Sequence, residues 1–113
     1  MDKRTTYKIN KAVKEKVLRF GKILEEQGIP VAKLVIFGSY AKKQFDKHSD
    51  IDVCIVSSAF GKDIIGDLKF LLAERRKIDN RIEPHPFSQK GYNELENPLV
   101  WEIRKYGLEI KTS

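Results

Sequence analysis

The N-terminal part of the chain alternates apolar and charged positions at the spacing of an amphipathic helix. Apolar residues recur every three or four positions across residues 7–27, which places them on one helical face. Thr5 or Thr6 can cap the start of this helix, and Gly28, followed by Pro30, ends it. The apolar stripe of the predicted helix consists of Ile9, Val13, Val17, Phe20 and Leu24.

The middle of the chain contains two short apolar runs, which predict buried strands. Residues 34–37 read Leu-Val-Ile-Phe and stop at Gly38 and Ser39, after which residues 39–44 can form one helical turn. Residues 51–56 are rich in β-branched side chains, which favour extended backbone. We therefore expect two adjacent strands joined by a turn-rich connection.

Helical and extended patterns alternate in the C-terminal half. Residues 64–76 have apolar positions at helical spacing, and residues 79–83 predict a strand that the Pro-His-Pro sequence at 84–86 ends. Asparagine followed by proline predicts the start of a helix over residues 97–107, and residues 108–110 are a last extended piece. This alternation predicts an α/β (α+β) fold, a small sheet flanked by helices.

The length and the cysteine content narrow the class of protein. A chain of 113 residues is enough for one domain, so we expect a single domain over residues 1–113. The single cysteine, Cys54, excludes an internal disulfide and a cysteine-rich zinc site, and its apolar neighbours predict a buried, inert thiol. No apolar run is long enough to span a membrane, and the N-terminus has no signal-peptide core. We therefore expect a cytoplasmic protein.

The charge suggests which ligands the protein could bind. The net charge is +6, from 22 basic and 16 acidic side chains. Such an excess suits a phosphate-bearing ligand, a nucleic acid or an acidic partner, although a solvated basic helix face would account for it equally. Because no arginine-rich run alternates with aromatic residues, binding to nucleic acid is not our first choice.

Two aspartates at the start of the second strand suggest a metal site. Asp50 and Asp52 are separated by two positions, so they lie on the same face, while Ile51 and Val53 point into the core. Two neighbouring carboxylates are unfavourable unless a cation neutralises them, and oxygen ligands suit Mg²⁺ or Mn²⁺. The alternative is a pair of surface aspartates beside a turn.

The end of the first strand supplies a feature that complements these aspartates. Gly38 allows close approach of backbone to a phosphate, the turn that follows presents free N–H groups, and Ser39 adds a hydroxyl. An ordinary strand-to-helix turn would have the same sequence. A phosphate cradle and a metal clamp on adjacent strands are together what nucleotidyl transfer from a Mg-nucleotide requires.

This combination resembles the signature of the DNA polymerase β-type nucleotidyltransferase superfamily. The motifs are Gly-Ser-Tyr-Ala-Lys at 38–42 and Ser-Asp-Ile-Asp-Val at 49–53, and the resemblance covers residues 30–110. It is closest to the minimal nucleotidyltransferases, which are often encoded beside a helical HEPN-type partner. The resemblance implies a mixed sheet flanked by helices, with Asp50 and Asp52 as metal ligands and with the phosphates held by Gly38 and Ser39.

The same resemblance implies a third carboxylate on a later strand. Glu83 is the best match, since Asp79 would lie at the entrance of that strand, and an exposed strand glutamate is the alternative. The sequence departs from the family pattern Gly-Ser-x-Ala-Arg-Gly at two positions. Lys42 stands for the arginine and Lys43 for the glycine, and Lys42 or Lys43 could contact a phosphate or remain solvated.

The resemblance also implies an activity. The protein would use Mg²⁺ (or Mn²⁺) held by Asp50, Asp52 and Glu83 to move AMP from ATP to an acceptor hydroxyl. The expected acceptor is a tyrosine of an HEPN-type toxin in a hetero-oligomer, which would make this chain an antitoxin that acts by AMPylation. Because the chain stops soon after the core, the acceptor would be small or supplied by a partner. The alternatives are an antitoxin that acts by contact alone, an enzyme that modifies a small molecule such as an aminoglycoside, and one that extends nucleic-acid ends.

Other residues carry weaker signals. His85, between two prolines, could reach the mouth of the site or have a structural role, and His48 is expected to be exposed. Tyr40 could stack on a base or pack in the core. Trp101 and Tyr106 belong either to the core or to a partner surface.

Overall fold

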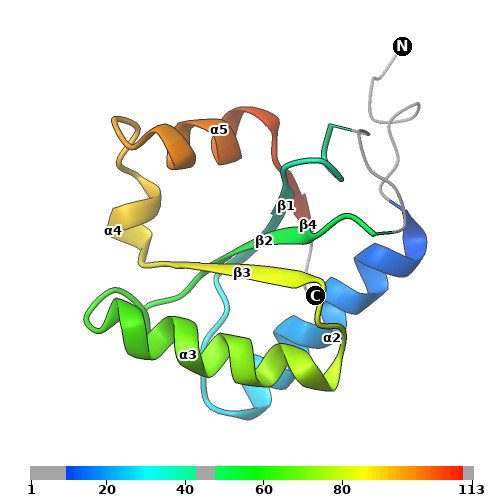
Figure 1. Cartoon of the computed structure of the whole chain (residues 1–113). Helices are drawn as coiled ribbons and strands as arrows, with labels where there is room; N and C mark the ends of the chain where they lie inside the picture. Colours follow the sequence, from blue (N-terminus) through cyan, green and yellow to red (C-terminus); the bar gives the residue numbers. More distant parts are fainter. Residues whose placement is uncertain (1–9, 43–47, 111–113) are drawn as a thin grey trace.

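The computed structural model describes residues 10–42 and 48–110, which form a four-stranded sheet with helices on both faces (Figure 1). No helix within these two ranges is long and apolar enough to cross a lipid bilayer. In chain order the elements are α2 (Lys11–Glu26), β1 (Lys33–Phe37), β2 (Ile51–Val56), α3 (Ile64–Glu74), the 3₁₀ turn η1 (Arg75–Lys77), β3 (Ile82–Phe87), α4 (Gln89–Tyr92), α5 (Pro98–Tyr106) and β4 (Leu108–Ile110).

The sheet is mixed, in agreement with the predicted fold class. Its strand order is β3-β2-β1-β4, with β1 antiparallel to both β2 and β4 and with β2 parallel to β3. The first two strands are antiparallel, so β1 ends where β2 begins. The parallel connection through α3 brings the start of β3 to the same end of the sheet. Three strands therefore converge where the predicted chemical residues lie.

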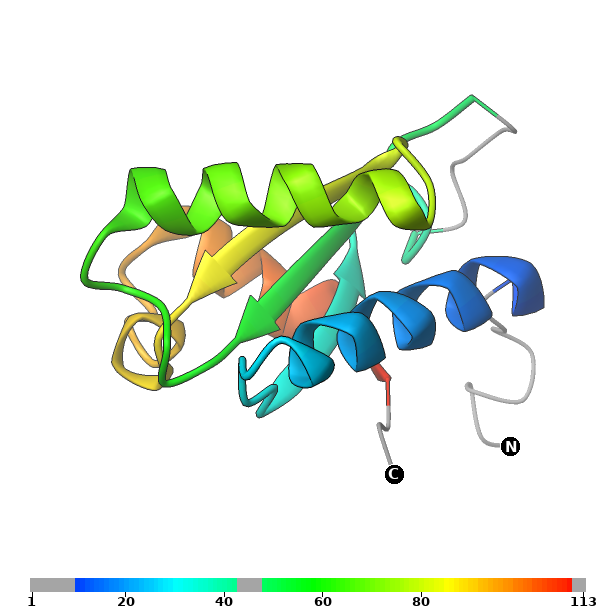
Figure 2. The same cartoon turned by 90° about the horizontal axis from the view of Figure 1, so that it is seen from below.

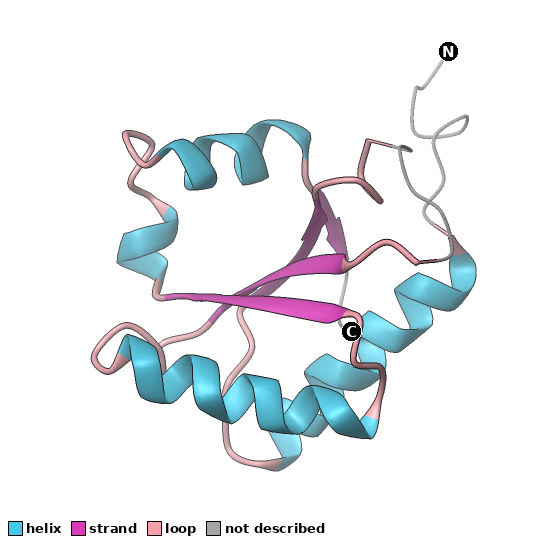
Figure 3. Cartoon of the chain, in the orientation of Figure 1, coloured by secondary structure: helices cyan, strands magenta, loops and turns pink. Residues whose placement is uncertain are grey.

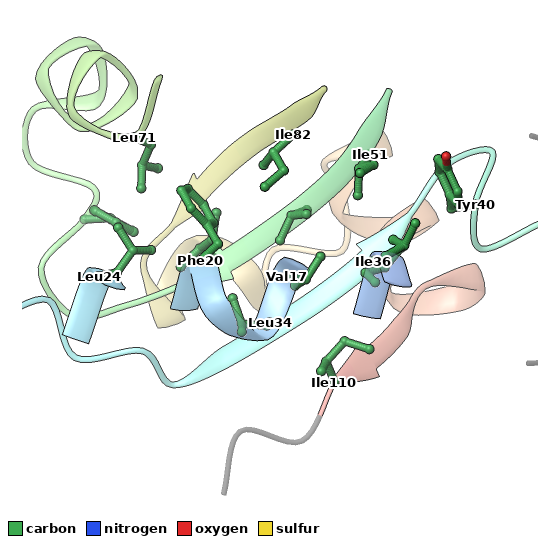
Figure 4. Close-up of a cluster of buried hydrophobic side chains, with 14 residues drawn as sticks. Val17, Phe20, Leu24, Leu34, Ile36, Tyr40, Ile51, Leu71, Ile82 and Ile110 are labelled. Atoms are coloured by element: carbon green, nitrogen blue, oxygen red, sulfur yellow. The ribbon is translucent and has the colours of Figure 1, made fainter. Parts of the chain in front are cut away.

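Apolar side chains fill both faces of the sheet. Helices α2 and α3 cover one face and α4 and α5 lie over the other, which is visible when Figure 2 is compared with Figure 3. The larger cluster lies under α2 and α3 and is drawn in Figure 4. Its fully buried members include Val17, Phe20, Leu24, Leu34, Ile36, Ile51, Val53, Ile55, Leu71 and Ile82.

The first described helix begins later than the sequence predicted. Helix α2 starts at Lys11, because the Asn10 side chain accepts hydrogen bonds from the backbone N–H groups of Ala12 and Val13 at 2.9 and 3.3 Å. The predicted caps, Thr5 and Thr6, and the first stripe residue, Ile9, lie outside the described residues. The other four residues of the predicted stripe are buried, as expected.

The third strand was placed wrongly by the sequence pattern. We predicted residues 79–83 with a stop at the prolines, whereas β3 continues through Pro84 and Pro86 to Phe87. Strand β3 is an edge strand. The Phe87 carbonyl accepts a hydrogen bond from the N–H of Ser57, the residue after β2, so alternate residues of β3 face β2. The two prolines occupy the other set of positions, where the missing N–H would have faced the free edge.

Candidate active site

The turn after β1 packs against the core. Gly38 has a φ of +74°, in the left-handed region that favours glycine, and its carbonyl accepts a hydrogen bond from the Lys42 N–H at 3.1 Å. Tyr40 within the turn is buried, with 5% of its surface exposed, so it packs in the core. The predicted helical turn is present as far as Lys42, and Lys43 lies outside the described residues.

Gly38 lies directly beside the second aspartate of the motif. Phe37 is the register partner of Asp52 across β1 and β2, so the residue after Phe37 passes over the start of β2. A Cβ atom at position 38 would collide with Oδ2 of Asp52. Glycine is therefore needed here both for the backbone conformation and for the space, and the turn and the carboxylate are held in contact.

Three potential metal ligands meet on β2 and β3. The parallel register pairs Asp52 with Glu83 and Cys54 with His85. Atoms of Asp52, Glu83 and His85 that could bind a metal lie within 4.8 Å of one another. Glu83 is exposed, while the side chains of Asp52 and His85 are both 27% exposed. We call these three residues the donor cluster.

His85 is the member of the donor cluster that the sequence did not single out as a ligand. Its Nε2 lies 3.2 Å from Oδ1 of Asp52, and its ring packs edge-on against Phe37 with the centroids 4.9 Å apart. Glu83 and His85 are two positions apart in the sequence, so they lie on the same face of a strand that includes both. The sequence pattern places the end of the strand before His85, so it does not indicate this residue as a ligand.

Asp50 is not a member of the donor cluster. It precedes β2 by one residue and is exposed, and it is not among the residues that group within 4.8 Å in the described part of the chain. The chemistry of the donor cluster, two carboxylates and an imidazole, nevertheless fits a divalent metal ion.

Asp79, the other candidate for the third carboxylate, forms salt bridges with two basic side chains. It accepts hydrogen bonds from Nζ of Lys16 at 2.6 Å and from the Arg81 guanidinium at 3.0 Å. The hydrogen bond from Arg81 holds the pKa of the Asp79 carboxyl well below its ordinary value, with Lys16 contributing in the same direction. Arg81 also donates to the Tyr40 hydroxyl at 3.4 Å, so these residues connect α2, the start of β3 and the turn after Gly38.

The predicted phosphate ligand Lys42 is directed toward α5. Its Nζ lies 3.5 Å from Oε2 of Glu102 and 5.1 Å from the ring centroid of Tyr106. Ser39 belongs to the same turn and is half-buried. Trp101 is exposed and packs edge-on against Tyr106. Neither aromatic residue belongs to the core, which excludes the first of the two predicted roles.

The thiol of Cys54 is buried and unreactive, as expected. Cys54 is fully buried in β2 among apolar side chains. Burial raises the pKa of its thiol to about 12, because the thiolate would lose its hydration. It therefore takes no part in the chemistry of the neighbouring donor cluster.

A cavity of about 720 Å³ opens along the free edge of β3, beside the donor cluster. Glu83 and His85 belong to its wall, so the cavity and the donor cluster are continuous. Most of the remaining wall is apolar and comes from α3, β3 and the start of α5. These apolar residues are Ile64, Leu68, Leu72, Pro84, Pro86, Phe87 and Leu99. No local sequence pattern predicts this cavity, because it depends on how α3 and α5 flank the edge strand.

Comparison with known proteins agrees with the geometry. The crystal structure of a candidate nucleotidyltransferase from Sulfolobus solfataricus superposes with a TM-score of 0.53 over 88% of this chain and 86% of that chain. At 20% sequence identity this likeness supports the fold alone. No curated protein matches the chain in sequence. A family model described as a nucleotidyltransferase domain matches residues 7–111, nearly the whole chain. The chain therefore belongs to the nucleotidyltransferase domain family.

Proposed function

We propose that the protein is a metal-dependent nucleotidyltransferase that moves AMP from ATP to a tyrosine hydroxyl of a helical, HEPN-type toxin, and so acts as its antitoxin. One observation supports the transferase chemistry. Gly38, in the turn after β1, lies in contact with Asp52 of the donor cluster. The toxin partner and the choice of ATP rest on the resemblance to minimal nucleotidyltransferases.

The proposed roles of Gly38, Asp52 and Glu83 follow from their positions, whereas those of Ser39 and Asp50 rest on the resemblance. Gly38 and Ser39 hold the phosphates through backbone N–H and hydroxyl groups, and Asp50, Asp52 and Glu83 supply carboxylates for Mg²⁺. A bound divalent ion neutralises phosphate charge and lowers the pKa of the acceptor hydroxyl.

The reaction is an in-line displacement at phosphorus. The acceptor oxygen forms a bond to the α-phosphorus, and the bond from that phosphorus to the oxygen bridging to the β-phosphorus breaks. Pyrophosphate leaves, and the hydroxyl proton passes to Glu83. Because attack and departure occur on opposite sides, the acceptor enters opposite the side that holds the pyrophosphate.

The cavity along β3 is on the acceptor side in this scheme. Gly38 and Ser39 follow β1, on one side of Asp52, whereas the cavity opens beyond Glu83 on the other side. The charged side chains of its wall include two glutamates and Lys90, so the wall does not attract a polyanion such as a nucleic acid. Its apolar residues suit the apolar face of a polypeptide.

The free edge of β3 restricts the form of that polypeptide. Pro84 and Pro86 offer no N–H toward the edge, so an added strand would find no donors at these positions. A helical segment needs no backbone partner, because its own N–H groups are already paired. This favours a helical acceptor protein, as the HEPN resemblance implies.

Intact mass spectrometry tests the proposal. Purified protein mixed with ATP, Mg²⁺ and a HEPN-type partner protein should add one or more adenylate units to that partner. Asp52→Ala should stop the modification, whereas Glu96→Gln, a charge removal at an exposed residue outside the cavity wall, should not.

Cell protection separates the enzyme from an antitoxin that acts by contact alone. Under our proposal Asp52→Ala fails to protect cells from the partner although it still binds it. Full protection by Asp52→Ala with an unmodified partner would replace the enzymatic mechanism with inhibition by contact.

A further inference from the structure

The donor cluster differs from the all-oxygen set that the sequence predicted. Among residues 10–42 and 48–110, the histidine, cysteine, aspartate and glutamate side chains that come within 4.8 Å of one another as a group are Asp52, Glu83 and His85. Two of them contribute oxygen and the third contributes nitrogen. An imidazole beside two carboxylates changes which metal the site favours.

The spacing between the imidazole and the carboxylate suits a shared ion. His85 Nε2 lies 3.2 Å from Asp52 Oδ1. Two atoms that bind one ion at about 2.1 Å and at right angles are about 3.0 Å apart, close to this separation. The two atoms can therefore face one ion with little movement.

The backbone holds both β3 ligands in place. Glu83 immediately precedes Pro84, and His85 immediately precedes Pro86. A residue before proline is confined to extended conformations, because the proline ring clashes with the helical alternative. Each ligand of β3 is thus fixed in the strand by the proline that follows it, and the His85 ring is further held by the edge contact with Phe37.

We infer that His85 is a metal ligand of this site and that its nitrogen gives the site a preference for Mn²⁺ over Mg²⁺. Mg²⁺ strongly favours oxygen ligands, whereas transition metals accept imidazole readily. The inference deepens the metal-dependent transfer proposed above, on which it rests. Its test reads metal coordination without ATP or acceptor, so it can fail while the transferase function stands, and the reverse is also true.

The test uses Mn²⁺ alone and pulsed electron paramagnetic resonance. Bound Mn²⁺ should show electron spin echo modulation from a directly coordinated ¹⁴N nucleus. The chain has two histidines, His48 and His85, so the assignment is a choice between two residues. Protein made with ¹⁵N-labelled histidine should lose the ¹⁴N pattern, which identifies imidazole as the source without any substitution.

Matched variants then assign the nitrogen. His85→Gln should remove the ¹⁴N modulation and lower Mn²⁺ affinity about 10-fold or more by calorimetry, while Mg²⁺ affinity changes less than about 3-fold. His48→Gln, at an exposed position, should change neither quantity. Circular dichroism and thermal unfolding establish that both variants fold.

Three outcomes would overturn the inference. The first is bound Mn²⁺ without ¹⁴N modulation in the unsubstituted protein, in which case His85 only donates a hydrogen bond to Asp52. The second is a signal that survives His85→Gln and disappears in His48→Gln. The third is an equal loss of Mn²⁺ and Mg²⁺ affinity in His85→Gln, which would remove the metal preference.

Discussion

At the scale of single residues, the carboxylates near the start of β3 have different surroundings. Asp79 is already neutralised by Lys16 and Arg81, and the lowered pKa of its carboxyl reflects those contacts. Glu83 is exposed and lies within reach of Asp52. Within residues 10–42 and 48–110, Glu83 forms no salt bridge, and a carboxylate that faces another carboxylate without a neighbouring cation is the better metal ligand. The surroundings therefore support Glu83 as the third carboxylate.

Substitution of Glu83 tests this assignment. Glu83→Gln removes a negative charge from the acceptor side of the site but leaves the turn after β1 untouched. We expect transfer to fall about 100-fold or more, with nucleotide affinity largely retained. Single-turnover kinetics and nucleotide titration measure the two effects, with Glu96→Gln as the control. If Glu83→Gln retained full transfer, the third ligand would have to be sought elsewhere.

Gly38 and Gly28 form a matched pair for measuring the cost of the close approach to Asp52. Both have positive φ, +74° and +88°, but a Cβ at Gly28 would meet nothing within 4 Å. Gly28→Ala should therefore cost only backbone strain, about 1–2 kcal/mol of unfolding free energy. Gly38→Ala should cost more in urea unfolding and should also abolish transfer, because it displaces Asp52. Equal stability losses with intact transfer in both variants would contradict the contact.

At the scale of elements, local pattern located most helices and strands but not the full site. The runs at residues 34–37 and 51–56 became β1 and β2 because each has its own apolar signal. The predicted third strand stops at residue 83 because proline normally ends a strand, whereas β3 continues to Phe87. Only the sheet order shows that β3 is an edge strand, where prolines are tolerated. The pairing of Asp52 with Glu83 depends on the parallel register through α3, which no local pattern contains.

Three elements that frame the site are connected by one ion-paired network. Lys16 of α2 and Arg81 before β3 both bind Asp79, and Arg81 reaches Tyr40 in the turn after β1. The side chain of Asp79 is 15% exposed, so its partners replace much of its hydration. The network fixes the start of β3 relative to the turn that is proposed to hold the phosphates.

The stability of this network should depend on pH. The pKa of Asp79 is lower in the folded than in the unfolded protein, so its stabilisation is complete above the unfolded value near 4 and is lost as pH falls toward the folded value. Asp79→Asn should lower the unfolding free energy by about 2 kcal/mol at pH 7. The difference from the unsubstituted protein should shrink at pH 3, as measured by urea unfolding at both pH values. A difference independent of pH would show that the carboxylate charge is not what stabilises the fold.

At the scale of the whole molecule, an exposed apolar surface lies beside the donor cluster, at the free edge of β3. Helix α3 buries only Leu71 fully, while Ile64, Ile65 and Leu68 are 64%, 70% and 38% exposed. Such a group of exposed aliphatic side chains on one helix is typical of an interaction surface. Because the cavity beside them reaches Glu83, a protein bound there would lie next to the donor cluster.

A comparison of substitutions at Leu68 and Leu95 tests whether the acceptor protein docks at this edge or whether any added surface charge weakens its binding. Both leucines are exposed, at 38% and 55%, but only Leu68 belongs to the cavity wall. Leu68→Glu should raise the KM for the protein acceptor about 10-fold or more, since a charge would be buried in an apolar contact. ATP affinity and thermal stability should change little. Leu95→Glu should leave all three quantities unchanged. If the two variants raised the KM equally, or if neither did, the acceptor would dock elsewhere, whereas a selective effect of Leu68→Glu would assign this edge to the acceptor.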